Sequence, residues 1–211
     1  MANPDLFRLR VTFAKRGRCA MLSHLEIARA LERAVRRAGL PYAVSQGFSP
    51  HMKIAFGAAL PVGVGGEEEI FDVQLVRWVD PERALAALRA SSVEDLMVEA
   101  CSYIGPREAA ASVAFPVSDY EAAFAAPLAC LELPAELTVV RKKKEKTLTV
   151  ADYLEAGPTQ KILPSGQALV SFTLRARPTG SLRPDLVVAQ LLEANPGVLL
   201  QRMTRVRQRL A

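Results

Sequence analysis

The sequence has few of the residues from which metal and cofactor sites are built. It contains three cysteines and two histidines in 211 residues. Cys19, Cys101 and Cys130 lie far apart, so they form neither a disulfide framework nor the ligand run of a zinc or iron–sulfur site. The phosphate-binding loop G-x-x-x-x-G-K-S/T is also missing. We therefore expect no metal, no cofactor and no nucleotide hydrolysis of that type.

Long apolar runs are absent as well. No stretch approaches the ~20 residues that span a bilayer, and residues 1–10 have no apolar core of the signal-peptide kind. We expect a cytoplasmic protein without membrane contact. With 50% hydrophobic and 23% charged residues, the composition is typical of a packed globular protein.

The net charge of +5 and the isoelectric point near 9.3 point to a polyanionic partner. The positive charge is concentrated, because residues 1–56 contain ten Lys and Arg against three Asp and Glu. A localised basic region of this kind favours a binding surface over a general solubility effect.

The first half of the chain predicts an α+β domain. Alternating apolar residues indicate a strand over 7–15, and Ser23 and Glu26 have the spacing of a capping box that begins a helix reaching Gly39. Leu25, Ala28, Leu31, Val35 and Ala38 form its expected core stripe. Further strands are expected over 53–60, 69–79 and 96–104, with a helix from Pro81 to Arg89. The order strand, helix, two strands, helix, strand is the split βαβ, or ferredoxin-like, pattern.

The second half gives a weaker version of the same pattern. Strands are expected over 112–124, 137–141, 168–177 and 199–210, a helix over 184–193, and a strand or helical turn over 148–154. The turn at Gly105-Pro106 marks the expected boundary. The prediction is a ferredoxin-like domain over 1–106 and a second α+β domain over 107–211.

Two stretches resemble the most recognisable motifs of the radical SAM-linked proteins. They are FAKRGRCAMLSHLE at Phe13–Glu26 and GFSPHMKIAFGAALPVGVGGEEEIFDV at Gly47–Val73. Weaker likeness covers residues 140–153, 182–192 and 202–210. Glu26 stands where aspartate is expected, and Met52 where proline is common.

The resemblance implies a context and no settled biochemical function. Such domains are fused behind a radical SAM enzyme or encoded beside one. This chain lacks the C-x-x-x-C-x-x-C run that holds the cluster of such an enzyme. If the pairing holds, the radical SAM enzyme is a separate polypeptide.

Several basic clusters and the loop after Gly47 are candidate RNA-binding elements. Basic side chains neutralise phosphates, and an aromatic, a histidine and a lysine lie close together in the loop. The candidates are Lys15, Arg16 and Arg18; Arg29, Arg33, Arg36 and Arg37; Phe48, His51 and Lys53; Arg141, Lys142, Lys143 and Lys144; and Arg205 and Arg207. The last two share one face of the closing strand with Arg209.

The histidines and the acidic residues allow other interpretations. His51, with His24 and Lys53, could act in general acid–base catalysis, although the position of His24 at a helix start favours an exposed first-turn residue. Glu67, Glu68 and Glu69 favour a solvated edge over a metal site. Asp72 interrupts an apolar strand and is expected to pair with a basic residue on the facing strand.

Three functions remain open from the sequence. The favoured one is a non-enzymatic RNA-binding or adaptor subunit that acts with a separate radical SAM enzyme. The alternatives are a protein–protein scaffold and a metal-independent endoribonuclease using His51. The last rests on analogy with tandem ferredoxin-like nucleases.

Overall fold

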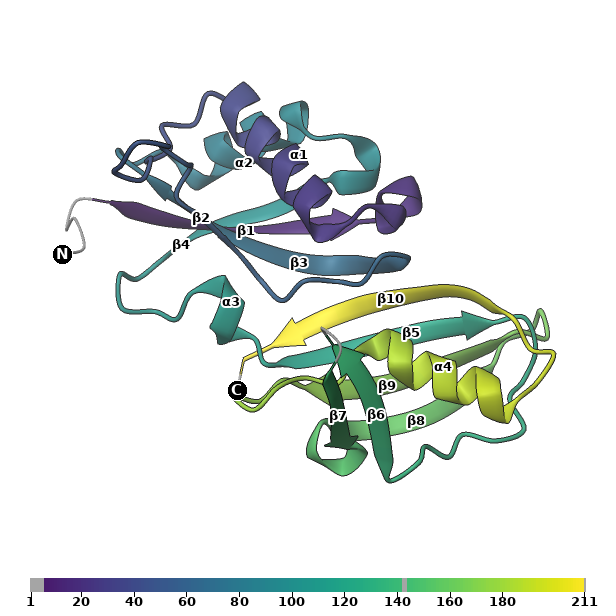
Figure 1. The fold of residues 1–211 in the computed structure, drawn as a ribbon. Helices are drawn as coiled ribbons and strands as arrows, with labels where there is room; N and C mark the ends of the chain where they lie inside the picture. Colours follow the sequence, from purple (N-terminus) through teal and green to yellow (C-terminus); the bar gives the residue numbers. More distant parts are fainter. Residues whose placement is uncertain (1–5, 142–143, 211) are drawn as a thin grey trace. The chain divides into compact units, whose positions relative to one another are not determined.

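The computed structural model describes residues 6–141 and 144–210, and the side chains of residues 140–144 are outside the description. The chain divides into two compact units, Met1–Phe115 and Pro116–Ala211. Both are of the α+β class (Figure 1). In the described part of the chain, no helix has the length and apolar character needed to cross a membrane.

The first unit is an antiparallel sheet with two main helices on one face (Figure 1). β1 pairs with both β3 and β4, and β2 pairs with the other edge of β3. Its elements are β1 (Phe7–Lys15), the short 3-10 helix η1 (Gly17–Met21), α1 (His24–Arg37), β2 (Ile54–Phe56), β3 (Val64–Leu75), α2 (Pro81–Ser91), a second 3-10 helix η2 (Glu94–Leu96), β4 (Val98–Ile104) and α3 (Ala111–Ala114).

The core of the first unit lies between the sheet and the helices α1 and α2. Leu9 and Val11 of β1 and Phe71 of β3 pack against Leu31 of α1 and Leu88 of α2. Burying each such side chain contributes roughly 1.5–3 kcal/mol. The strand alternation that buries these residues turns Arg8, Arg10, Asp72 and Gln74 to the opposite face of the sheet.

Helix α1 begins with the expected capping box. The Ser23 hydroxyl accepts from the Glu26 amide at 3.4 Å, and the Glu26 carboxylate accepts from the Ser23 amide at 2.8 Å. Leu31 and Val35 are buried as expected. Leu25 is 67% exposed, and Ile27 and Ala34 are buried in its place on the inner face. The expected core stripe was therefore wrong in the first turn of α1, where Leu25 was expected to be buried and Ile27 is buried instead.

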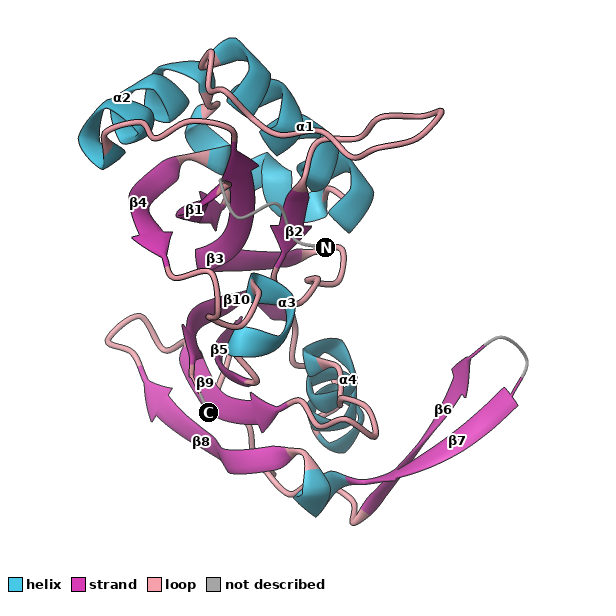
Figure 2. Cartoon of the chain, turned by 90° about the vertical axis from the view of Figure 1, so that its left-hand side faces the viewer, coloured by secondary structure: helices cyan, strands magenta, loops and turns pink. Residues whose placement is uncertain are grey.

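The second unit pairs its strands in a corresponding way. β5 pairs with β9 and β10, and β8 pairs with β9, all antiparallel. The elements are β5 (Val117–Phe124), β6 (Glu136–Arg141), β7 (Lys144–Thr149), a 3-10 helix η3 (Val150–Asp152), β8 (Leu154–Ile162), β9 (Ala168–Arg175), α4 (Pro184–Ala194) and β10 (Leu200–Arg209). β6 and β7 form a separate two-stranded ribbon that extends away from the sheet of this unit (Figure 2).

The segment after the turn at Gly105 belongs to the first unit. The unit ends at Phe115 and not at Pro106. Arg10 donates from Nη2 to the Ala109 carbonyl at 2.9 Å, and its guanidinium lies over the Phe115 ring, 5.0 Å from the centroid. The Asp72 carboxylate accepts from the Ala111 amide at 2.8 Å. We call residues 105–115 the strap, because they cross the sheet face opposite α1 and α2.

Candidate nucleic-acid interface

The outer face of α1 carries four exposed arginines. Arg29, Arg33, Arg36 and Arg37 recur at helical spacing on the side away from buried Leu31. Arg36 forms a salt bridge with Glu32 at 3.4 Å, which is weak at such an exposed position. Among the described residues, Arg29, Arg33 and Arg37 have no side-chain hydrogen bond or salt bridge. We call the four residues the arginine stripe.

The other basic residues near the N-terminus are mostly engaged. Lys15 is buried and donates from Nζ to the Val64 carbonyl at 3.1 Å. Arg16 pairs with Glu67 and with Glu99, the latter at 2.9 Å. Arg18 is exposed. The alternation of β1 turns residue 15 to the same side as Leu9 and Val11, so the sequence already contained the signal that Lys15 points inward.

The loop after α1 is held at its base and exposed at its tip. The Ser45 amide donates to the His51 carbonyl at 2.8 Å, and the His51 amide donates to the Ser45 hydroxyl at 3.0 Å. Met52 is buried below this base, while Phe48 at the tip is fully exposed. His51, at the base, is also exposed. The loop therefore presents an aromatic ring to solvent on an ordered backbone.

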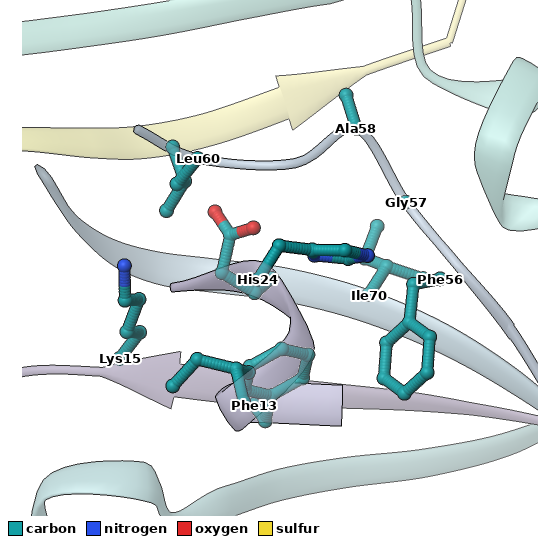
Figure 3. Close-up of a pocket in the computed structure, with 10 residues that line it drawn as sticks. Phe13, Lys15, His24, Phe56, Gly57, Ala58, Leu60 and Ile70 are labelled. Carbon is teal, nitrogen blue, oxygen red and sulfur yellow. The ribbon is translucent and has the colours of Figure 1, made fainter. Parts of the chain in front are cut away.

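His24 lies in a small pocket and is not the exposed first-turn residue that the sequence favoured. Its ring packs edge-on against Phe56, with ring centroids 5.6 Å apart. Lys15 lines the same pocket (Figure 3). Glu69 lines it too, and the pocket volume of about 20 Å³ is close to that of a single water molecule. Burial lowers the pKa of His24, the Glu69 charge opposes that shift and the Lys15 charge adds to it.

The residues of the ribonuclease alternative are not brought together in one pocket. His24 lines the pocket with Lys15 and Glu69, and Lys53 lines another between β2 and the strap. His51 lines neither of them. General acid–base catalysis needs its groups within hydrogen-bond reach of one reacting centre. The arrangement gives little support to a catalytic set of His51, His24 and Lys53.

Asp72 is a buried, heavily hydrogen-bonded acidic side chain of the first unit. It is 4% exposed, and its cross-strand partner is Arg10, which donates from Nε to Oδ1 at 2.7 Å and from Nη2 to Oδ2 at 3.0 Å. Arg8 also reaches Oδ2, at 3.3 Å. The expected pairing of Asp72 with a basic residue on the facing strand is confirmed.

The metal-ligating and thiol groups form no obvious reactive centre in the described part of the chain. No cluster of three or more His, Cys, Asp or Glu residues there is arranged to hold a metal ion. Glu67 of the acidic run pairs with Arg16, and Glu69 is buried. Burial raises the pKa of the Cys101 thiol to about 11. This thiol therefore stays protonated at neutral pH and is a poor nucleophile.

The basic candidates of the second unit are only partly described. Lys142 and Lys143, and the side chains of Arg141 and Lys144, lie outside the described residues. Arg205 is 2% exposed, whereas Arg207 is exposed. The pairing of β10 with β5 shifts register between these two residues. A bulge at that point interrupts the simple alternation from which one shared face was expected.

The comparison with known proteins gives a family and no activity. A family model described as an uncharacterised protein conserved in bacteria, DUF2344, matches residues 8–184. No curated protein matches the sequence.

Proposed function

Because this chain belongs to the DUF2344 family of uncharacterised bacterial proteins, we propose its function from its geometry: a cytoplasmic, non-enzymatic RNA-binding adaptor. The observation that carries the proposal is the arginine stripe of α1. Three of its four guanidinium groups have no partner among the described residues, and all four lie on one helix face. Those three guanidinium groups can bind phosphates without giving up a salt bridge.

The loop tip adds a second type of contact. Phe48 is a fully exposed aromatic ring, and unpaired bases stack on such rings regardless of sequence. Stacking on one exposed ring contributes roughly 1–3 kcal/mol per base. The combination favours single-stranded or looped RNA over a regular duplex, because only unpaired bases offer a free face.

The sheet face of the first unit is a poor alternative. In RNA-recognition domains of split βαβ order, an open sheet face stacks the bases. Here the strap crosses that face through Arg10, Asp72 and Phe115. We therefore place the RNA on α1 and the loop.

The RNA contact is tested by replacing Arg29, Arg33 and Arg37 together with glutamine. Losing three phosphate contacts should reduce the slope of log K against log salt by about 2, and weaken binding of a labelled single-stranded RNA roughly 10- to 100-fold at 0.1 M salt. Fluorescence anisotropy at several salt concentrations measures both quantities.

The matched control removes three exposed arginines elsewhere in the first unit, at Arg77, Arg83 and Arg107. It changes the net charge by the same amount, so long-range attraction falls equally. An equal loss in both triple variants would show that only net charge matters and would contradict an interface on α1.

A separate radical SAM enzyme is the proposed partner. The support is the resemblance of Phe13–Glu26 and Gly47–Val73 to the radical SAM-linked proteins. We expect this chain to co-elute in size-exclusion chromatography with a radical SAM enzyme encoded beside it, when RNA is present. Separate elution of the two purified proteins, with and without RNA, would remove the partner from the proposal.

We also propose the ferredoxin-like arrangement for the first unit. The strand order β4-β1-β3-β2, with α1 and α2 as the connections, supports it. An experimental structure in which either connection crosses to the other face of the sheet would contradict this assignment.

A further inference from the structure

A pocket of about 500 Å³ opens beside the strap in the first unit. Its floor is formed by the edge of the sheet, and the strap forms one wall. Its polar lining consists of Arg8, Lys53, Asp72, Gln74 and Glu108, and Ile54 and Pro106 are among its apolar residues. The volume lies within the range of small-molecule sites, which are mostly apolar with a few placed polar groups.

Three of these polar residues, Arg8, Gln74 and Lys53, form one row across adjacent backbone segments. Arg8 and Gln74 are cross-strand partners in the pairing of β1 with β3. The backbone N–H of Gln74 donates to the Lys53 carbonyl at 2.9 Å. This bond extends the pairing of β2 with β3 by one residue. Side chains directly opposite on paired strands stand on the same face. Lys53, Gln74 and Arg8 therefore follow one another along the pocket floor.

Three of the polar groups, Arg8, Asp72 and Glu108, are already engaged by the protein. Arg8 donates from Nη1 to the Glu108 carbonyl at 2.7 Å and from Nη2 to Asp72 at 3.3 Å. Asp72 also accepts from Arg10 and from the Ala111 amide. The Glu108 carboxylate accepts from the Gly105 amide at 2.7 Å. These groups hold the strap and fix the shape of the pocket.

Lys53 and Gln74 remain available to a ligand. Both are half-buried, and among the described residues neither side chain has a hydrogen bond or a salt bridge. A half-buried ammonium and a half-buried amide that line the same cavity leave hydrogen-bonding capacity unused. The ammonium attracts an anion, while the amide can donate and accept at once.

We propose that this pocket binds a single nucleotide, with the phosphate on Lys53 and the edge of the base on Gln74. Lysine is a common phosphate ligand, and a glutamine amide forms paired hydrogen bonds with a base edge. The apolar side chains of Ile54 and Pro106 supply contact area for the base. The nucleotide is either one residue of the RNA or a free mononucleotide. The first source rests on the proposed RNA-binding function, and the second does not.

The proposal is tested by titrating the four nucleoside 5′-monophosphates into the full chain and following binding by calorimetry. We expect at least one to bind. Lys53→Gln and Gln74→Ala should each weaken that binding by about tenfold or more, as loss of a charge-assisted or a paired hydrogen bond implies. Lys161→Gln and Gln190→Ala, in the second unit, are the matched controls and should leave it unchanged.

The nucleoside and inorganic phosphate test which parts of the nucleotide the pocket recognises. The nucleoside without its phosphate should bind more weakly and should be insensitive to Lys53→Gln. Inorganic phosphate binding as tightly as the mononucleotides, with no effect of Gln74→Ala, would overturn the nucleotide in favour of a plain anion site. Equal loss of binding in the control variants would overturn the location.

A competition experiment separates this pocket from the interface on α1. Displacement of the mononucleotide by short RNA, together with weaker RNA binding by Lys53→Gln, supports an RNA residue as the occupant. Mononucleotide binding without RNA binding supports the pocket as a free-nucleotide site and contradicts the proposed function. RNA binding without mononucleotide binding, unaffected by Lys53→Gln, overturns the pocket and leaves the proposed function standing.

Discussion

Replacing Asp72 with alanine should lower the free energy of unfolding of the first unit by about 3–5 kcal/mol. The carboxylate is 4% exposed and accepts hydrogen bonds from Arg8, Arg10 and the Ala111 amide. Its removal leaves two guanidinium groups, 15% and 12% exposed, without their shared counter-charge. The large effect comes from these uncompensated charges, more than from the favourable energy of the ion pairs themselves.

The single tryptophan makes the measurement specific to this unit. Trp78 stacks on Tyr103 with ring centroids 6.1 Å apart, so its fluorescence in a urea titration reports unfolding of the first unit. Glu32→Ala is the control, because Glu32 forms an exposed pair with Arg36 in the same unit and its loss should cost about 1 kcal/mol or less. Similar small losses in both variants would show that the Asp72 network contributes little to stability.

Replacing Gly157 with alanine should destabilise the second unit by about 3 kcal/mol. Gly157 has φ +81, a conformation that costs a residue with a Cβ atom roughly 1–2 kcal/mol. The added Cβ would also lie 2.6 Å from the Ser171 carbonyl oxygen and 3.0 Å from Phe172 Cα. Because these contacts are to the backbone of the paired strand β9, relief requires the strand to shift, at a further cost of roughly 1–3 kcal/mol.

Gly166 provides a control with the same backbone conformation. Its φ is +83, and an added Cβ would meet nothing within 4 Å. Gly166→Ala should therefore cost only the conformational part, roughly 1–2 kcal/mol. The difference between the two variants, measured by circular dichroism in urea, isolates the steric contribution. Equal losses would mean that β8 moves away from β9 without cost.

The first half of the fold was predictable because its signals are local. Alternation along Phe7–Lys15 matches β1, and the Ser23 and Glu26 pair marks the start of α1. The pairing of Asp72 also followed from one charge inside an apolar strand. What the local pattern could not give was the first turn of α1, where Leu25 is exposed. A capping residue fixes where a helix starts, but tertiary packing decides which face is buried.

The fold of the second half is less predictable from the sequence, because its strands are less regular. β8 was missed: it contains Gly157 and Pro158, is mostly exposed and shifts register against β9. Within the second unit it pairs with β9 alone, and proline is tolerated in strands with such a free edge. β7 was missed because it begins in a lysine-rich run that favours a solvated loop.

The candidate sites, like the fold, were predictable from the sequence only where their pattern is local. The arginine stripe was visible from helical spacing alone. The row of Lys53, Gln74 and Arg8 was not, because it depends on the register of strands separated by long stretches of chain. Gln74 was absent from the candidates, and the only signal for it was its place opposite Arg8 once the strands are paired.

The strap has a consequence for dividing the protein into independent halves. The turn at Gly105-Pro106 is the natural place to cut by sequence. A fragment ending there would lack the Glu108 and Ala109 carbonyls, the Ala111 amide and the Phe115 ring that satisfy Arg8, Arg10 and Asp72. Three charged side chains would then face water on what had been a covered surface. A fragment of the first unit therefore keeps these partners only if it continues through Phe115.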